Sequence, residues 1–236
     1  MRQLLRMAGV WALDYLYVVR HQVRAAFSRS DPDVLVAHGQ GPPVVLLPGI
    51  YETWRFLLPL ARHIHGLGHP VHVVAALGRN RTTIADGAAL VAEYLEARQL
   101  HDVTIVAHSK GGLIAKHLMG LPGRGERVRT TIAVSTPFAG SAYARFIPIR
   151  SVRALAPSNT VMQQLARERA ANERIVSVYG WFDPHIPGGC DLAGARNVRL
   201  AVGGHFRILA SKDLLEVVDA VLAGDDPARD SVGGIP

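Results

Sequence analysis

Hydrophobic positions follow two alternating patterns from Pro42 onward. Short apolar runs predict β-strands, and apolar residues spaced three or four apart predict helices. The alternation of the two is typical of βαβ units, so we expect a mainly parallel sheet with helices on both faces. The expected strands cover residues 44–47, 71–74, 103–107, 130–134, 175–179 and 198–202, and the expected helices cover residues 54–67, 84–99, 111–119, 161–170 and 212–222.

One connection is longer than this alternation requires. About forty residues separate the strand that ends near Ser135 from the strand that begins near Arg174. A connection of this length inside a compact domain is often an active-site lid, so we expect a short cap insertion at about residues 136–173. Residues 31–224 are expected to form one domain, and the aperiodic tail at 225–236 is expected to be flexible.

The first thirty residues differ in charge from the rest of the chain. They contain five arginines and a single acid, Asp14, around an apolar middle at residues 7–19. This middle is too short to cross a bilayer as a helix, which needs about twenty residues. Asp14 interrupts it and no small-residue cleavage site follows, so secretion is less favoured than a cytoplasmic location. We expect residues 1–30 to form a basic amphipathic arm that either docks on its own domain or contacts a membrane surface through residues 1–27.

Composition excludes several classes of protein. The 236 residues are 49% hydrophobic and 19% charged, which provides enough apolar material for one substantial core. Cys190 is the only cysteine, so an intrachain disulfide and a zinc site with several cysteines are both excluded. The net charge is +7, but no basic patch is interleaved with aromatic residues, which argues against a nucleic-acid partner.

The residues that predict chemistry lie where the strand at 103–107 meets the helix at 111–119. There the chain reads Ala-His-Ser-Lys-Gly-Gly, with a small residue two positions before and two positions after Ser109. A nucleophile elbow needs small residues at these positions because its sharp turn brings them against neighbouring backbone. The turn also exposes the serine hydroxyl at the edge of the sheet. The alternative is that Ser109 only caps a helix in an ordinary turn. His108 is expected to pack inside the fold.

Two further residues follow in the chain order that such elbows have, acid first and histidine second. Asp183 comes after the fifth expected strand, and His205 comes after the sixth. Both loops leave the carboxyl ends of parallel strands, so both side chains can reach Ser109. We therefore expect Ser109 to be the nucleophile, His205 the general base and Asp183 the group that orients the imidazole.

Alternatives remain for both partners of the serine. Asp183 precedes Pro184, where an aspartate commonly forms a turn, and His205 is one of eleven histidines. Asp191 is the second candidate for the acid and His185 the second candidate for the base. Neither of these two directly follows an expected strand.

An oxyanion hole needs backbone N–H groups beside the nucleophile. The first is expected to be that of Lys110, at the start of the helix that follows Ser109. The second should come from the loop after the first strand, where the chain reads Leu-Pro-Gly-Ile-Tyr. Ile50 is the candidate, with Tyr51 next in line, and the alternative is a plain turn.

Taken together, these segments resemble the α/β-hydrolase superfamily, and more narrowly its bacterial lipase- and esterase-like members. The resemblance covers about residues 42–223. It implies the α/β-hydrolase fold, the site residues named above, no organic cofactor and no catalytic metal. The similar segments are P-V-V-L-L-P-G-I at 43–50, A-H-S-K-G-G-L at 107–113, I-A-V-S-T-P-F-A-G-S at 132–141, the Asp183 loop and G-G-H-F at 203–206.

Two features depart from that family. The strands that usually precede the first one are reduced to a short expected strand at 34–37, so the fold is a trimmed version. Lys110 also places a cation beside the nucleophile at a helix start, where the helix dipole disfavours positive charge.

We expect a serine hydrolase that cleaves carboxylic esters of apolar acyl groups through an acyl-enzyme on Ser109. The partner is a small-molecule or lipid ester, bound against Tyr51, Trp181, Phe182 and Phe206. The same machinery would serve an acyltransferase, a thioesterase or an amidase. An alternative from another class is a catalytically idle, membrane-associated binding module on the same fold.

Overall fold

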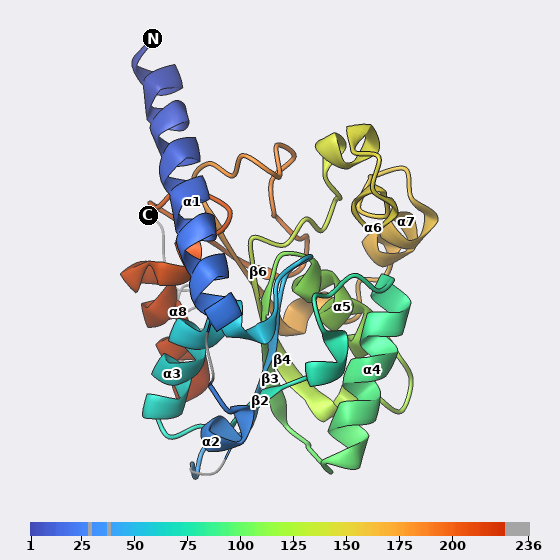
Figure 1. Ribbon diagram of the computed structural model, residues 1–236. Helices are drawn as coiled ribbons and strands as arrows, with labels where there is room; N and C mark the ends of the chain where they lie inside the picture. The colour runs from blue at the N-terminus through green and yellow to red at the C-terminus, as the bar shows by residue number, and fades with distance from the viewer. Residues whose placement is uncertain (28–29, 37–38, 225–236) are drawn as a thin grey trace, which may run out of the picture.

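A six-stranded sheet lies at the centre of the computed structural model, which describes residues 1–27, 30–36 and 39–224 (Figure 1). The strand order is β2-β1-β3-β4-β5-β6, and every neighbouring pair is parallel. The expected parallel α/β sheet is thus confirmed. The strands are β1 Val44–Leu47, β2 Val71–Val73, β3 Val103–His108, β4 Val128–Val134, β5 Ile175–Gly180 and β6 Arg196–Leu200.

Helices cover both faces of this sheet (Figure 1). Val45 and Ile105 point to the face covered by α4 and α5, whereas Val44 and Val106 point to the face covered by η1, α3 and α8. Because both faces are buried, the strands are continuous apolar runs. The α-helices are α1 Arg2–Phe27, α2 Pro32–Val36, α3 Leu58–Gly66, α4 Ile84–Ala97, α5 Lys110–Met119, α6 Arg150–Arg153, α7 Thr160–Arg167 and α8 Lys212–Ala223, and the 3-10 helices are η1 Trp54–Leu57, η2 Ala75–Leu77, η3 Gly125–Arg127, η4 Ala142–Phe146, η5 Asn172–Arg174 and η6 Arg207–Ala210.

One expected element has the wrong type. Residues 32–36 form the helix α2, not the strand expected at 34–37, whose last residue lies outside the described residues. Pro32 suits the first position of a helix, and the Asp31 carboxylate accepts the N–H of Asp33 as an N-cap does. The other expected elements are present with ends that shift by a few residues; β6, for example, begins two residues earlier than expected. The tail at 225–236, expected to be flexible, lies outside the described residues.

The N-terminal arm is one long helix, α1, which runs along the side of the molecule and projects beyond it (Figure 1). It contacts η1 and η6, and it buries Val10, Asp14 and Ala25 on its inner face. Its outer face exposes large hydrophobic side chains, including Leu5 and Leu16. In the part of the chain that the structure describes, no helix is long and apolar enough to cross a membrane. The contacts with η1 and η6 dock the helix on its own domain, and its outer face stays uncovered.

The connection between β4 and β5 contains η4, α6 and α7 and lies beside the carboxyl ends of the strands (Figure 1). Tyr143, Val152 and Leu155 of this connection line a cavity together with Ser109. The Tyr51 hydroxyl lies 3.0 Å from Ser151 Oγ and so links the loop after β1 to α6. This segment occupies the place that the sequence analysis gives to the cap insertion.

Gly111 allows α5 to approach β1 closely, and its replacement tests this packing. A Cβ atom here would lie 2.5 Å from the Leu47 carbonyl oxygen, closer than real contacts of this kind. We expect Gly111→Ala to lower the free energy of unfolding by about 1–3 kcal/mol, the usual cost of overpacking. Urea unfolding followed by circular dichroism measures the loss. The control is Gly66→Ala in α3, where nothing lies within 4 Å of the new atom. Equal stability of the two variants would contradict this expectation.

Candidate active site

Ser109 lies at a sharp turn between β3 and α5, with φ 52° and ψ −120°. A positive φ is unfavourable for a residue with a side chain, so the surrounding structure must hold it there. The Thr136 hydroxyl donates to the Ser109 carbonyl oxygen at 3.1 Å. Gly112 makes this contact feasible, because a Cβ atom at that position would lie 2.1 Å from Thr136 Oγ1. The turn has the strand-to-helix form expected of a nucleophile elbow.

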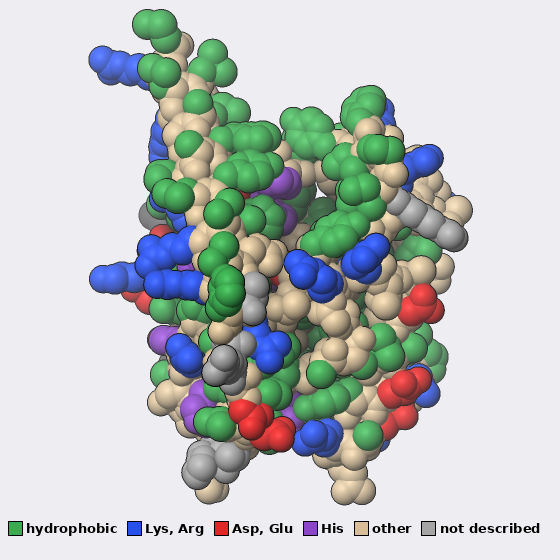
Figure 2. Space-filling model, viewed as in Figure 1, with side chains coloured by type: hydrophobic (Ala, Val, Ile, Leu, Met, Phe, Trp, Pro, Cys, Tyr) green, Lys and Arg blue, Asp and Glu red, His purple; other side chains and the backbone are tan. Residues whose placement is uncertain are grey.

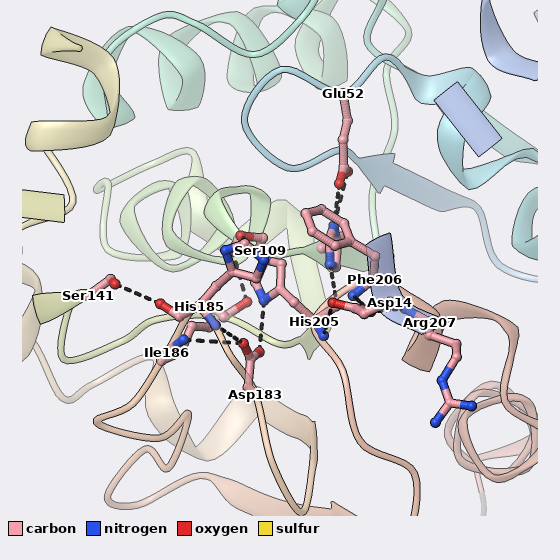
Figure 3. A network of polar contacts seen from close by, with 12 residues as sticks. Asp14, Glu52, Ser109, Ser141, Asp183, His185, Ile186, His205, Phe206 and Arg207 are labelled. Carbon is pink, nitrogen blue, oxygen red and sulfur yellow. Dashed lines mark hydrogen bonds and ion pairs between the residues drawn. The ribbon is translucent and has the colours of Figure 1, made fainter. Parts of the chain in front are cut away.

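Side chains from three loops meet at the carboxyl edge of the sheet (Figure 3). His205 Nε2 lies 3.0 Å from Ser109 Oγ, and His205 Nδ1 lies 2.7 Å from Asp183 Oδ2. A carboxylate only accepts hydrogen bonds, so Nδ1 carries the proton and Nε2 is free to accept from the Ser109 hydroxyl. All three side chains are buried. The structure thus brings together the three residues that the sequence analysis selects for a triad.

Asp183 is held in place by backbone as well as by His205. Its Oδ1 accepts the N–H of His185 at 2.8 Å and that of Ile186 at 3.2 Å. Burial acts to raise the pKa of Asp183, but the charge and hydrogen bond of His205 and the backbone hydrogen bond together outweigh it. The pKa of this carboxyl therefore lies below its usual value, and Asp183 stays ionised beside the imidazole.

The two alternative triad residues have other contacts. Asp191 accepts a hydrogen bond from the Tyr179 hydroxyl. His185 lines the same cavity as Ser109, with its ring centroid 5.0 Å from that of His205. Burial, together with the charge of His205, lowers the pKa of His185 to about 4, so its ring is neutral at pH 7. His205, and not His185, forms the hydrogen bond with Ser109 Oγ, and Asp183, and not Asp191, forms the hydrogen bond with His205 Nδ1.

Asp14 of α1 binds the backbone of the His205 loop (Figure 3). Its Oδ2 accepts the N–H of His205 at 2.9 Å, and its Oδ1 accepts those of Phe206 and Arg207 at 2.9 and 2.8 Å. The Asp14 side chain is 0% exposed. The residue that interrupts the apolar stretch of the arm is therefore the one that fastens the arm to the candidate site.

His108 approaches His205 from another direction. Its Nε2 lies 3.0 Å from the His205 carbonyl oxygen, and its Nδ1 lies 3.0 Å from Glu52 Oε2. Both partners only accept, so both ring nitrogens carry protons and the imidazole is cationic. Burial acts to lower the pKa of His108, but the charge and hydrogen bond of Glu52 outweigh it and raise the pKa. Glu52 also accepts the N–H of Gly49 at 2.7 Å, so this buried ion pair connects the loop after β1 to His205.

The candidate oxyanion donors lie on two turns next to Ser109. Ile50 borders the same cavity as Ser109. It lies in a turn that Glu52 closes twice, by accepting the N–H of Gly49 and by donating its own N–H to the Gly49 carbonyl oxygen. The N–H of Lys110 belongs to the first residue of α5, where backbone donors carry partial positive charge.

The sequence places the cation of Lys110 at a helix start beside the nucleophile, and the structure shows how this side chain is accommodated. Its ammonium group is buried and donates to the carbonyl oxygens of Asn80 and Thr82, in the loop before α4. Burial lowers the pKa of Lys110 to about 8. The cation at this helix start is therefore stabilised by two carbonyl groups.

A cavity of about 130 Å³ adjoins Ser109 and His205. A larger hollow, of about 720 Å³, lies between the cap segment and the start of α4. We place the candidate site at the smaller cavity because Ser109 and His205 line it and do not line the larger one. Its apolar wall consists of Ile50, Pro137, Tyr143, Ala144, Ile147, Val152, Leu155, Ile186 and Phe206.

Of the four aromatic residues expected around the substrate, only Phe206 lines this cavity. Trp181 and Phe182 line a neighbouring hollow of about 490 Å³, on the side of α1. Tyr51 instead directs its hydroxyl to Ser151. The structure differs from the expectation for these three residues because packing against α1 and the cap segment sets the direction of their rings.

Asp14 and Glu52 are two buried carboxylates whose contacts with the site the sequence pattern does not predict. The position of Asp14 could have indicated its burial, since a single acid in an apolar helix must find hydrogen-bond donors once that helix is packed. Nothing in the sequence around Glu52 indicates burial, because a glutamate in a turn is ordinarily exposed. His108 packs inside the fold, as expected.

Several solved structures share the fold of this chain. No protein-family model matches the chain, and no curated protein matches its sequence. The mature Bacillus licheniformis lipase BlEst2 is 17% identical with a TM-score of 0.60, over 79% of this chain and 95% of the lipase. MGS-MChE2, an α/β-hydrolase enzyme from the metagenome of lagoon sediments of Mar Chica, Morocco, is 15% identical with a TM-score of 0.58, over 81% and 93%. This chain has the α/β-hydrolase fold. Because a fold does not specify a reaction, the activity must be argued from the site.

His185 should make the stability of the protein sensitive to acid. The pKa of His185 is about 4 in the folded protein, against an ordinary value of about 6.5. Between these values the unfolded chain binds a proton that the folded protein does not, so stability falls as the pH is lowered. From pH 7.5 to pH 5 this group costs about 2 kcal/mol. We expect His185→Phe, which keeps a ring, to reduce the acid-induced loss by about that amount.

Urea unfolding at pH 7.5 and pH 5 provides the measurement. The control is Leu67→Phe, which changes an exposed side chain that carries no titratable group and should leave the acid-induced loss as in the wild type. The same loss in His185→Phe and in the wild type would show that burial of His185 does not set the acid sensitivity.

Proposed function

We propose that the protein is a serine hydrolase that cleaves carboxylic esters with apolar acyl groups. The observation that supports this best is the hydrogen-bonded chain from Ser109 through His205 to Asp183, beside a cavity with a mainly apolar wall. An ionised carboxylate, an imidazole in one tautomer and a serine hydroxyl in a row are the arrangement that activates serine as a nucleophile.

The proposed reaction has two halves. Ser109 Oγ attacks the ester carbonyl carbon while its proton passes to His205 Nε2. The bond to the alcohol oxygen then breaks, His205 gives that oxygen the proton, and the acyl group stays on Ser109 Oγ. A water molecule, deprotonated by His205, attacks the acyl-enzyme and releases the carboxylic acid and the free serine. Asp183 stays ionised throughout and stabilises the imidazolium formed in each half.

Negative charge develops on the carbonyl oxygen of the ester when Ser109 Oγ attacks, and hydrogen-bond donors are needed to stabilise it. In this proposal they are the backbone N–H groups of Ile50 and Lys110, which belong to the two turns beside Ser109. Such preorganised donors are worth about 3 kcal/mol each in comparable enzymes. Glu52 supports this assignment because its hydrogen bonds with Gly49 hold the turn that contains Ile50.

The size of the cavity limits the acyl group. An apolar cavity of about 150 Å³ holds one benzene molecule, so the 130 Å³ beside Ser109 accommodates an acyl group of about six carbons. A longer chain would have to extend into the neighbouring hollow, which shares Tyr143 and Ile186 with the cavity. Trp181 and Phe182 would then contact the distal part of the substrate.

Labelling and turnover test the role of Ser109. We expect a fluorophosphonate probe to label the wild type at Ser109, as located by peptide mass spectrometry, and the protein to hydrolyse p-nitrophenyl butyrate. Ser109→Ala should lose the label and reduce kcat by about 10⁴-fold or more, because the nucleophile is removed. Ser158→Ala, which replaces an exposed serine, is the control and should retain both. Absence of both labelling and turnover in the wild type would favour a catalytically idle binding module.

An acyltransferase, a thioesterase or an amidase would use the same acyl-enzyme and would be labelled equally. Product analysis with competing alcohols, and with thioester and amide substrates, separates these activities from ester hydrolysis. For the hydrolase we expect free carboxylic acid as the main product even when an alcohol acceptor is present.

The exposed hydrophobic side chains support a lipid partner. In the described chain, thirteen of the fifteen exposed large hydrophobic residues lie in 1–27 or in 143–149 of the cap segment. Figure 2 shows hydrophobic side chains along α1 and over the cap segment, on the two sides of a hollow in which histidine side chains are visible. The acid of α1, Asp14, is buried, so the charges that this helix presents outward are arginines. We propose that this face rests on an anionic bilayer.

Vesicle binding tests this contact. We expect co-sedimentation with vesicles of phosphatidylcholine and phosphatidylglycerol, weakening as salt is added. The double variant Leu5→Asp, Leu16→Asp should bind at least about ten-fold more weakly, because two exposed leucines are removed from the contact. Leu67→Asp, at an exposed leucine outside α1 and the cap segment, should bind as the wild type does. Unchanged binding of the double variant, or self-association on gel filtration without vesicle binding, would refute the bilayer as partner.

A further inference from the structure

Among the residues that the structure describes, the Asp14 carboxylate binds the backbone of one loop (Figure 3). Three consecutive N–H groups, of residues 205–207, converge on its two carboxylate oxygens. The carboxylate is buried away from water, so its oxygens and the three N–H groups satisfy one another's hydrogen bonds. A side chain from the start of the sequence therefore determines where the backbone of His205 lies.

We propose that Asp14 is a positioning residue for His205, acting from α1 through the backbone of the His205 loop. The proposal rests on the proposed function, in which His205 Nε2 takes the proton of Ser109. The Nε2–Oγ distance of 3.0 Å depends on the position of the peptide that carries the ring. A displacement of about 1 Å at such a contact can cost about 100-fold in rate.

The peptide groups of His205 are held from two directions. Asp14 accepts its N–H at 2.9 Å, and His108 donates to its carbonyl oxygen at 3.0 Å. Without Asp14, the N–H of His205 would lose its acceptor, and the remaining restraints on the loop would include His108, the ring contacts and the hydrogen bond from Gly204 N–H to the Phe182 carbonyl oxygen. The position of the ring would then be restrained by fewer contacts, and Nε2 would spend less time within hydrogen-bonding distance of Ser109 Oγ.

Glycine before the histidine allows the close approach of Asp14. Gly204 has φ +115°, and a Cβ atom there would lie 2.6 Å from Asp14 Oδ1. The Gly-Gly-His sequence of this loop therefore has a physical reason beyond the turn itself: the carboxylate occupies the space that a side chain would need.

A carboxylate suits this place better than an amide of the same size. Three N–H groups need three acceptor positions, and the two oxygens of Asp14 provide them. An asparagine has one acceptor oxygen, and its NH₂ group would face one of the backbone donors. Asp14→Asn therefore keeps the volume of the side chain and weakens the hold on the loop, because at least one of the three N–H groups loses its acceptor.

Asp14→Asn is the test variant, and Tyr17→Ala is its matched control on the same helix. Tyr17 packs against Phe56, with ring centroids 6.1 Å apart, so its removal weakens the docking of α1 without changing the Asp14 side chain. The measurements are kcat and KM for p-nitrophenyl butyrate, and the rate and final extent of fluorophosphonate labelling. The final extent counts the folded active sites in each preparation.

We expect Asp14→Asn to lower kcat per labelled site and the labelling rate by about 10- to 100-fold, with KM within about two-fold of the wild type. Tyr17→Ala should keep kcat per labelled site within about two-fold, even though α1 is held less firmly. A merely structural role of Asp14 would lower the number of labelled sites and leave the rate of each unchanged. Equal kcat per labelled site in the two variants would overturn the proposal.

If Asp14→Asn does not fold, Gly204→Ala disturbs the same contact from the loop while Asp14 stays in place. The same selective loss of kcat is expected, and an unchanged kcat per labelled site would overturn the proposal. Failure of the proposed function is distinguishable, because the wild type itself would then show no labelling at Ser109, and the positioning role would fall with it.

Discussion

The candidate site depends on four hydrogen bonds that reach His205 from three separate parts of the chain. Asp183 binds ring Nδ1, Ser109 lies at Nε2, Asp14 accepts the backbone N–H and His108 donates to the carbonyl oxygen. These groups are buried, where an unsatisfied polar group costs about 1–3 kcal/mol. Loss of one partner would therefore disturb the others. A histidine acts as a base only while its ring keeps one tautomer and one direction, and these contacts restrain both.

The parallel sheet explains how residues so far apart in sequence come together. In parallel strands all carboxyl ends lie at one edge, so the loops after β1, β3, β5 and β6 open on the same side. Ser109 reaches that edge only through a strained backbone, which the close packing of α5 against β1 and Thr136 maintains. The topology of the sheet thus brings the site residues to one edge, and local packing sets the directions of their side chains.

The helix α1 has different roles on its two faces. Its inner face carries Asp14, the buried acid that binds the His205 loop, and its outer face carries exposed leucines and arginines. The cap segment exposes further hydrophobic side chains across the hollow (Figure 2). A bilayer on this face would lie next to the cavity and next to the helix that restrains the histidine. Partner binding and catalysis would then share one structural element.

The amino-acid sequence by itself determined the strands, most helices and the selection of Ser109, Asp183 and His205. A sheet covered on both faces requires continuous apolar runs, and a nucleophile elbow requires small residues, so both leave local patterns. Tertiary structure alone decided the helix at 32–36, the directions of Tyr51, Trp181 and Phe182, and the partners of Asp14 and Glu52. Asp14 binds backbone N–H groups about 190 positions away, and every residue except proline supplies such a group. A contact of that kind leaves no residue pattern at its far end, so only the packed chain reveals it.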